Sequence, residues 1–254
     1  MWKGDYLFVL NNLVEKDFKL RYRNMSLGVF WSMLNPLVLM AVLTFVFTKI
    51  FTVNNPHNYP LEVLCGLVAF SFFSVAWLGG TTCLIENAQL IKRVPVPREI
   101  IPVASVLSNC VHLGIQILLL LAMAVVFGHP PNVYWLWLPV VWGLEVVFVC
   151  GLALMFSALN VYVRDMRYIV ESGTTVLFWL VPVFYSFSII PARFVDIYLY
   201  NPLAAVIRCL RFILVDAQPP LAGTMLKLVA SSFIVLIAGI VVFEKLKRRF
   251  YEFL

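Results

Sequence analysis

LEVLCGLVAFSFFSVAWLGGTTCL, residues 61–84, carries Glu62 as its one charged side chain. A helix needs about 20 mainly apolar residues to cross the hydrocarbon core of a bilayer, and this stretch is long enough to do so. We therefore predict a transmembrane helix over residues 61–84. Gly79 and Gly80 near its end indicate either a weak point in the helix or a close approach to a neighbouring helix.

Similar apolar runs recur along the chain, at about 30–51, 101–127, 136–160, 174–190 and 225–243. The runs at 101–127 and 136–160 are long, so we expect them to tilt or to add turns outside the lipid. Pro182 predicts a kink in the short run at 174–190. The chain is 62% hydrophobic and 13% charged, whereas soluble domains are about 25% charged. The sequence therefore predicts an all-α integral membrane protein, a six-transmembrane-helix bundle that forms a single domain over residues 1–254.

The distribution of Lys and Arg over the connecting segments predicts the orientation of the bundle. With the N-terminus inside, the inner segments hold 14 of these residues and the outer segments hold 5, which are Lys49, Arg193, Arg208, Arg211 and Lys227. We therefore expect both termini in the cytoplasm. Basic clusters beside apolar runs favour contact with anionic membrane lipid. No soluble module offers a basic face to nucleic acid, so we expect no nucleic-acid partner.

Residues 5–24 precede the first apolar run and are too polar to span a membrane. Apolar side chains recur there at helical spacing, at Tyr6, Leu10, Leu13, Val14 and Phe18. This pattern predicts an amphipathic helix in the cytoplasmic interface, with a soluble helix packed on the bundle as the alternative. Three basic residues, named here the basic trio, lead from this helix into the first span: Lys19, Arg21 and Arg23.

Two connecting segments are predicted to carry helices of their own. Residues Glu86 to Arg93 can form a short helix, which Pro95 and Pro97 would stop. The outer segment at about 191–224 is apolar for a connector. We expect one or two short re-entrant helices there, because backbone in lipid has to satisfy its own hydrogen bonds.

The sequence contains no G-x-x-x-x-G-K-[ST] loop of the kind that cradles the phosphates of ATP. Uphill transport would therefore draw its energy from a partner or from an ion gradient. Four of the five cysteines lie in apolar runs, no two form a CxxC pair, and the three histidines are far apart. We therefore predict no catalytic site, no metal site, no structural disulfide and no cofactor bound by this chain.

Glu145 is the one acidic residue deep inside a predicted span, and such a residue is a candidate for function. On the third span Asn109, His112 and Gln116 share a helical stripe at a depth that Glu145 on the neighbouring fourth span can reach. Hydrogen bonds between helices, which would fix the bundle, are one interpretation of this cluster. Proton relay and substrate contact are the alternatives.

The first and fifth spans each carry a face that mixes aromatic and hydroxyl side chains. The residues are Thr44, Phe47, Thr48 and Phe51 on the first span and Phe178, Tyr185 and Ser188 on the fifth. Such faces suit sugars, because their C–H faces stack on aromatic rings while their hydroxyls bond to polar groups. They equally suit contact with lipid in an interfacial belt.

Four stretches in order resemble a known family: KLRYR with LGVFWSMLNPL in residues 19–37, PREIIP at 97–102, VRDMR at 163–167 and NPL at 201–203. Over nearly its whole length the chain resembles the membrane subunit of ABC exporters for cell-surface polysaccharides, the O-antigen and teichoic acid type. The first stretch, with its R-Y-R and L-G-x-x-W spacing, is the most specific.

The resemblance implies a homodimer in the bacterial inner membrane that binds two cytoplasmic ATPase subunits, with ATP held by those partners. It implies that spans one and five line a channel for a lipid-linked polysaccharide, whose anionic headgroup the basic trio would recruit. It implies a coupling helix that contacts the ATPase through Glu86, Gln89, Leu90, Ile91, Lys92 and Arg93. Residues 181–186 depart from the serine-proline and tyrosine-proline pairs of such families, so the resemblance does not extend to the details of the outer gate.

Three other functions stay open at this point. An ABC permease for another lipid or for a drug would share the same architecture. A proton-coupled secondary transporter would use Glu145 and His112 and would need no ATPase. A purely structural membrane anchor would form no stable complex with an ATPase.

Overall fold

The computed structural model describes residues 6–22, 30–50, 57–93, 96–247 and 250 of the chain. All regular structure in these ranges is helical. Five segments in the same ranges are long and apolar enough to cross a membrane: Phe30–Ile50, Tyr59–Glu86, Ile100–Val126, Val133–Tyr162 and Ala222–Leu246. The structure is thus that of a multi-pass membrane protein.

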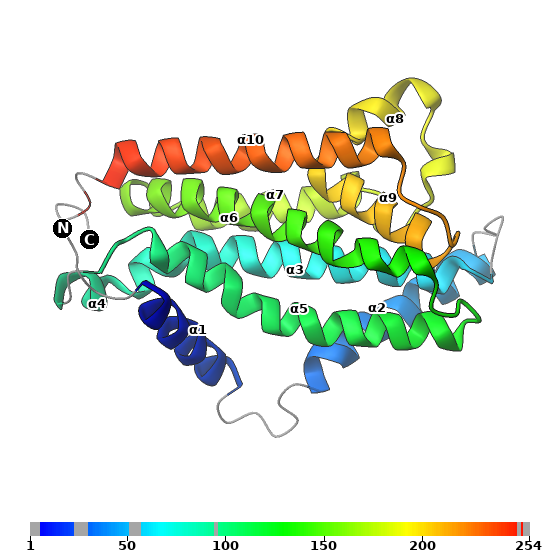
Figure 1. Cartoon of the computed structure of the whole chain (residues 1–254), viewed down its shortest axis with the longest axis horizontal. Helices are drawn as coiled ribbons and strands as arrows, with labels where there is room; N and C mark the ends of the chain where they lie inside the picture. The colour runs from blue at the N-terminus through cyan, green and yellow to red at the C-terminus, as the bar shows by residue number, and fades with distance from the viewer. Residues whose placement is uncertain (1–5, 23–29, 51–56, 94–95, 248–249, 251–254) are drawn as a thin grey trace.

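The long helices lie side by side along the long axis of the molecule, with α4 and the last turn of α10 at one end and α8 and α9 at the other (Figure 1). In chain order the elements are α1 Tyr6–Tyr22, α2 Phe30–Phe45, the π-helical turn η1 Val46–Ile50, α3 Tyr59–Glu86, α4 Ala88–Arg93, α5 Ile100–Val126, the 3-10 turn η2 Val133–Trp137, α6 Leu138–Tyr162, α7 Met166–Leu180, the 3-10 turn η3 Phe187–Ile189, α8 Ala192–Tyr198, α9 Pro202–Leu214 and α10 Ala222–Leu246.

Five of the six predicted spans are confirmed as helices within a few residues of their predicted bounds. The prediction for 174–190 is wrong in its bounds, because α7 begins at Met166 and ends at Leu180. Pro182 ends the helix rather than kinking it, since the residue before a proline avoids the α conformation. Val181 accordingly has the extended angles φ −82° and ψ 142°.

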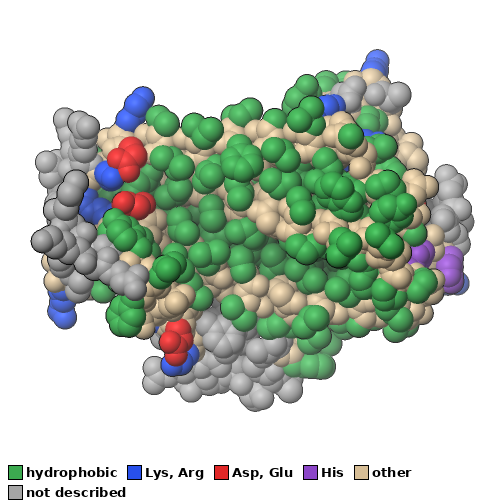
Figure 2. All heavy atoms as spheres, viewed as in Figure 1, with side chains coloured by type: hydrophobic (Ala, Val, Ile, Leu, Met, Phe, Trp, Pro, Cys, Tyr) green, Lys and Arg blue, Asp and Glu red, His purple; other side chains and the backbone are tan. Residues whose placement is uncertain are grey.

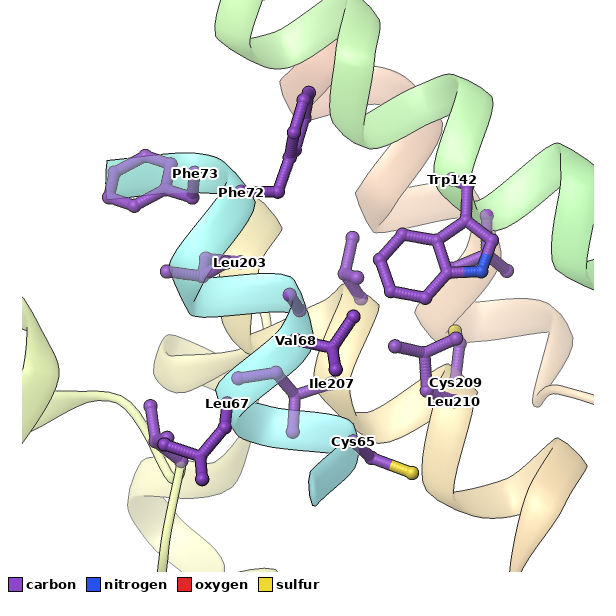
Figure 3. Close-up of a cluster of buried hydrophobic side chains, with 14 of the residues drawn as sticks. Cys65, Leu67, Val68, Phe72, Phe73, Trp142, Leu203, Ile207, Cys209 and Leu210 are labelled. Carbon is purple, nitrogen blue, oxygen red and sulfur yellow. The ribbon is translucent and has the colours of Figure 1, made fainter. Parts of the chain in front are cut away.

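The hydrophobic core centres on α3, which packs against α5, α6, α7 and α9. Figure 3 shows Val68 of α3 beside Ile207 of α9, Trp142 of α6 above Leu210 of α9, and Phe72 further along α3. All five side chains are buried. The outer segment contains two short helices, α8 and α9, and α9 is an integral part of the core. Their re-entrant position in a membrane stays a prediction.

A second apolar cluster, named here the inner cluster, lies at the end of the bundle that holds α4. It joins Leu13 of α1, Ile91 of α4, Ile101 of α5 and Phe243 of α10, all of which are buried. Through this cluster α1 packs against α5. The placement of α1 in a membrane interface stays a prediction.

Three helices of the bundle approach each other at glycines. A Cβ atom added at Gly80 of α3 would lie 2.4 Å from the Cβ atom of Ala153 on α6, and one added at Gly239 of α10 would lie 2.1 Å from the Gly151 carbonyl oxygen on α6. Only glycine permits such contacts, which are typical of helix pairs in membranes. Of the two interpretations of the Gly79–Gly80 pair, Gly80 therefore fits close packing.

The face of the molecule seen in Figure 2 carries a broad apolar belt, and the described charged side chains gather near its two ends and over α1. Helix α10 shows how such a surface arises, because Phe233, Ile234, Ile237 and Val241 along it are exposed. A surface of this kind is costly in water and is stable in the hydrocarbon core of a bilayer.

Candidate functional site

The aromatic faces predicted on the first and fifth spans meet through a residue that the sequence analysis did not single out. The ring of Phe184, in the turn after α7, has its centroid 5.6 Å from that of Phe47 on η1 and 5.7 Å from that of Phe178 on α7. Phe178 also contacts Phe70 of α3 edge-on at 5.1 Å. Phe47 and Phe178 thus belong to one aromatic cluster, whereas Phe51 lies outside the described residues.

Three of the four predicted hydroxyl groups bond within their own segments, and Tyr185 also bonds to Tyr198 of α8. The Thr44 hydroxyl is buried and has no partner among the described residues. Thr48 Oγ1 donates to the Thr44 carbonyl at 2.7 Å, and the Tyr185 hydroxyl donates to the Leu180 carbonyl at 2.5 Å. Ser188 is exposed, with its Oγ 3.1 Å from the Oγ of Ser186. These hydroxyls stabilise local backbone, and their contact with a transported molecule stays a prediction.

The turn after α7 is held by Arg211 of α9, a residue that the sequence analysis placed only in an outer segment. The Arg211 guanidinium is buried and donates to the carbonyls of Pro182 at 2.8 Å, Val183 at 2.9 Å and Tyr185 at 2.9 Å, while its Nε donates to the Glu62 carbonyl at 3.2 Å. Backbone that leaves a helix at membrane depth needs partners inside the protein. Arg211 supplies them for the break in the fifth predicted span.

Two open cavities lie on the side of α3 that faces α2, α7 and α1. The middle cavity, of about 250 Å³, lies between Asn35 of α2, Ser71 and Ser74 of α3 and Phe178 of α7. The inner cavity, of about 460 Å³, is lined by Thr82 and Glu86 of α3 and by residues of three other helices, Asp17, Ser105 and Arg167. The middle cavity thus lies between α2 and α7, which belong to the two spans predicted to line a channel.

Helix α4 occupies the position predicted for a coupling helix, but its residues do not all face outward. Gln89, Lys92 and Arg93 are exposed, Leu90 is half-buried, and Ile91 is 4% exposed within the inner cluster. Ile91 therefore anchors α4 on the bundle and is not placed to contact a partner, which corrects its predicted role. Glu86, at the end of α3, is exposed and lines the inner cavity.

At the end of the bundle that holds α4, named here the inner end, a hydrogen bond joins α1 to the junction between α3 and α4. Lys16 Nζ donates to Asn87 Oδ1 at 2.7 Å. In the basic trio, Lys19 Nζ donates to Glu15 Oε1 at 2.5 Å, and this hydrogen bond lowers the pKa of Glu15. Both side chains are exposed, so the pair is weak and leaves Lys19 able to exchange partners. Arg21 lies in the last turn of α1, and Arg23 lies outside the described residues.

The predicted polar cluster on α5 and α6 is split. Gln116 Nε2 donates to the Ser32 carbonyl at 3.3 Å and to Ser71 Oγ at 3.1 Å, which links α5 to α2 and α3. Asn109 Nδ2 donates to the Ser105 carbonyl within α5 at 2.7 Å. Glu145 is fully buried, and neither of its carboxyl oxygens has a hydrogen-bond partner among the described residues.

The expected contact between Gln116 and Glu145 is therefore not made. Gln116 provides the helix-to-helix bonding that was the simpler interpretation of this stripe. His112 is half-buried on α5. A further bond between helices, from Asn160 Nδ2 on α6 to the Thr81 carbonyl on α3 at 3.0 Å, escaped the sequence analysis, since single polar residues in apolar runs do not reveal their partners.

Known proteins resemble this chain along most of its length. The chain matches the ABC-2 type transporter family over residues 9–215. It is 34% identical over 251 residues to an O-antigen export system permease protein RfbA of Klebsiella pneumoniae, an alignment that covers 98% of this chain and 96% of that protein.

Two further relatives show how far the likeness extends. A protein named O-antigen export system permease protein RfbA in Myxococcus xanthus is 30% identical, over 97% of this chain and 95% of its own. The polysialic acid transport protein KpsM of Escherichia coli is 23% identical over 201 residues, which is 78% of each chain. The relatives are thus similar in length as well as in sequence.

Proposed function

Because this chain belongs to the ABC-2 type transporter family, we propose that it is the permease subunit of an ATP-driven exporter that moves a lipid-linked polysaccharide across the cytoplasmic membrane. The observation that carries this proposal is the similarity, over 98% of the chain, to a permease named for O-antigen export. The apolar belt in Figure 2 is consistent with a path across a bilayer.

In the proposed assembly α7 and the turn after it form the fifth of six spans. Helix α7 has 15 residues and so rises about 22 Å, which is shorter than the roughly 30 Å hydrocarbon core. The extended residues that follow complete the crossing, and the guanidinium of Arg211 satisfies their carbonyls. Both termini are then cytoplasmic, on the side of α4.

The permease works as a homodimer with two copies of an ATPase subunit, and α4 is the contact with that subunit. Support comes from the exposed residues Gln89, Lys92 and Arg93 at the inner end of the bundle. Large apolar side chains on α2 and α7 also stay exposed in the single chain, among them Val42, Phe45, Val176 and Trp179. A second copy and lipid together would cover them.

The proton-coupled alternative requires a hydrogen-bonded route through Glu145. Among the described residues its carboxyl oxygens have no such partner, and Gln116 bonds to Ser32 and Ser71 instead. This arrangement favours a structural role for the interior of α6 and leaves the driving force to ATP.

The proposal is tested by deleting the gene in its native cell and locating the lipid-linked polysaccharide. We expect the glycan to accumulate on the inner leaflet and to disappear from the cell surface, with both effects reversed by the wild-type chain. An ATPase subunit should co-purify with the tagged protein from the same cells. Normal surface glycan in the deletion strain contradicts the proposal.

A further inference from the structure

One face of α3 lines both cavities. Ser71 and Ser74 belong to the middle cavity, Thr82 and Glu86 belong to the inner cavity, and Val75 belongs to both. Residues three or four positions apart lie on the same side of a helix. These positions therefore form one continuous face, named here the α3 path, which runs from the middle of the bundle to the inner end of the helix.

The hydroxyl groups of the α3 path can still accept hydrogen bonds, because Ser74 and Thr82 donate to backbone carbonyls of α3 and Ser71 accepts from Gln116. A Cβ atom added at Gly79 would lie 3.5 Å from Ser105 Oγ, which is an ordinary contact. Helix packing therefore does not require glycine at this position, and the missing side chain adds space to the inner cavity. The middle cavity adds the Asn35 amide and the edge-on ring pair of Phe70 and Phe178. Volumes of about 250 and 460 Å³ approach or fall within the range of small-molecule sites.

The lining of the inner cavity holds more carboxylates than cations, and the nearby Lys16 donates to the lining residue Asn87. Two carboxylates, Asp17 and Glu86, line it together with one guanidinium, that of Arg167. Arg167 Nε already donates to Glu171 Oε1 at 2.9 Å. Carboxylates accept strong hydrogen bonds from hydroxyl groups, whereas a pyrophosphate placed beside them would be repelled.

We infer that the α3 path holds uncharged sugar units of the exported glycan, and that the anionic headgroup of the lipid carrier stays outside the inner cavity. The inference rests on the proposed function and adds to it a substrate-contacting helix that lies outside the two spans predicted to line the channel. It also assigns the neutral part and the charged part of the substrate to different places, since the basic trio is on α1 and in the segment that follows it.

The first test uses the permease–ATPase complex in inverted vesicles and measures ATP-driven uptake of radiolabelled lipid-linked glycan. Val75→Trp adds bulk where the cavities join, at a side chain that is 38% exposed; Val111→Trp on α5, 41% exposed, is the matched control. Gly79→Leu narrows the inner cavity, and Gly114→Leu is its control because an added Cβ there meets nothing within 4 Å. We expect both cavity variants to lower uptake by about tenfold with ATPase binding retained, and both controls to resemble the wild type.

The outcomes separate this inference from the proposed function. If the wild-type complex takes up no glycan, the proposed function fails. If the wild type is active and both cavity variants match their controls, the function stands and the α3 path is wrong. If Val75→Trp breaks the complex into single chains while Gly79→Leu transports normally, the groove is a contact between two copies of this chain, which also overturns the inference.

Photocrosslinking tests the same contact directly and does not depend on the bulky variants folding. A photoreactive phenylalanine analogue is placed at position 82 in the inner cavity, with position 111 as the control, and the complex is irradiated with radiolabelled glycan bound. We expect label at position 82 alone, attached to sugar units. Label attached to the lipid–pyrophosphate end, or equal labelling at both positions, contradicts the inference.

Discussion

Replacing Arg211 with Met removes the group that holds the turn after α7 while keeping much of the side-chain volume. The change leaves the carbonyls of Pro182, Val183, Tyr185 and Glu62 without the partner that now donates to them at 2.8–3.2 Å. Each buried acceptor left without a partner costs about 1–3 kcal/mol, so losing the three carbonyl partners in the turn should cost at least about 3 kcal/mol. We therefore expect the outer part of the bundle to open at least about a hundredfold more often.

The thiol of Cys65 reports this opening, because it is fully buried near Arg211. The assay follows the labelling rate of Cys65 by mass spectrometry in purified protein, with Cys83 in the inner cluster as an internal reference. The matched control is Arg208→Met, whose guanidinium lies over the rings of Phe187 and Phe212 and should cost only about 0.5–2 kcal/mol. Equal labelling of Cys65 in the two variants refutes the role assigned to Arg211.

Three further predictions follow from the inner end and the interior of the bundle. Ile91→Asp should lower the free energy of unfolding by several kcal/mol, because it buries a charge in the inner cluster. Lys92→Glu should reduce only ATPase co-purification. Similar unfolding temperatures for the two variants refute the burial argument. Changing the basic trio to Gln should reduce export by correctly inserted protein, measured in vesicles, and normal export leaves those residues a topological role only. Glu145→Gln and Glu145→Leu should both support substantial export. The Leu variant should be no less stable than the Gln variant, because the carboxyl group has no described partner to lose. Loss of transport in both variants contradicts this prediction.

The apolar spans could be predicted from the sequence because the hydrocarbon core requires about 20 consecutive, mainly apolar residues. Residues 61–84 and 225–243 contain almost no charge, and α3 and α10 cover them with a few residues to spare. The bounds predicted for the fifth span were wrong for a reason that is equally local. Arg167 and Glu171 make the first turns of α7 polar, so an apolar window begins too late.

The contacts that shape the candidate site could not be predicted in this way. Arg211 is 26–29 positions away from the turn that it holds, and no periodicity in the sequence connects them. Gln116 was expected to reach Glu145 from its depth in the membrane, but its rotation about α5 directs it to Ser32 and Ser71. Depth follows from counting residues, whereas the direction of a side chain depends on how neighbouring helices pack.

The buried position of Ile91 illustrates the same limit on α4. The sequence shows a short helix between two spans and cannot say which of its apolar residues faces the bundle. The structure assigns Ile91 to the inner cluster and leaves Gln89, Lys92 and Arg93 for a partner. A coupling surface on α4 is therefore more polar than the sequence alone predicts.

The central claim is that ATP, hydrolysed by a partner subunit, drives polysaccharide through this permease. The measurement is uptake of lipid-linked glycan into sealed inverted vesicles that contain the permease and its ATPase, with and without ATP and with a proton uncoupler. We predict uptake that requires ATP and persists when the uncoupler is present. Uptake that is indifferent to ATP and abolished by the uncoupler contradicts the account and favours proton-coupled transport.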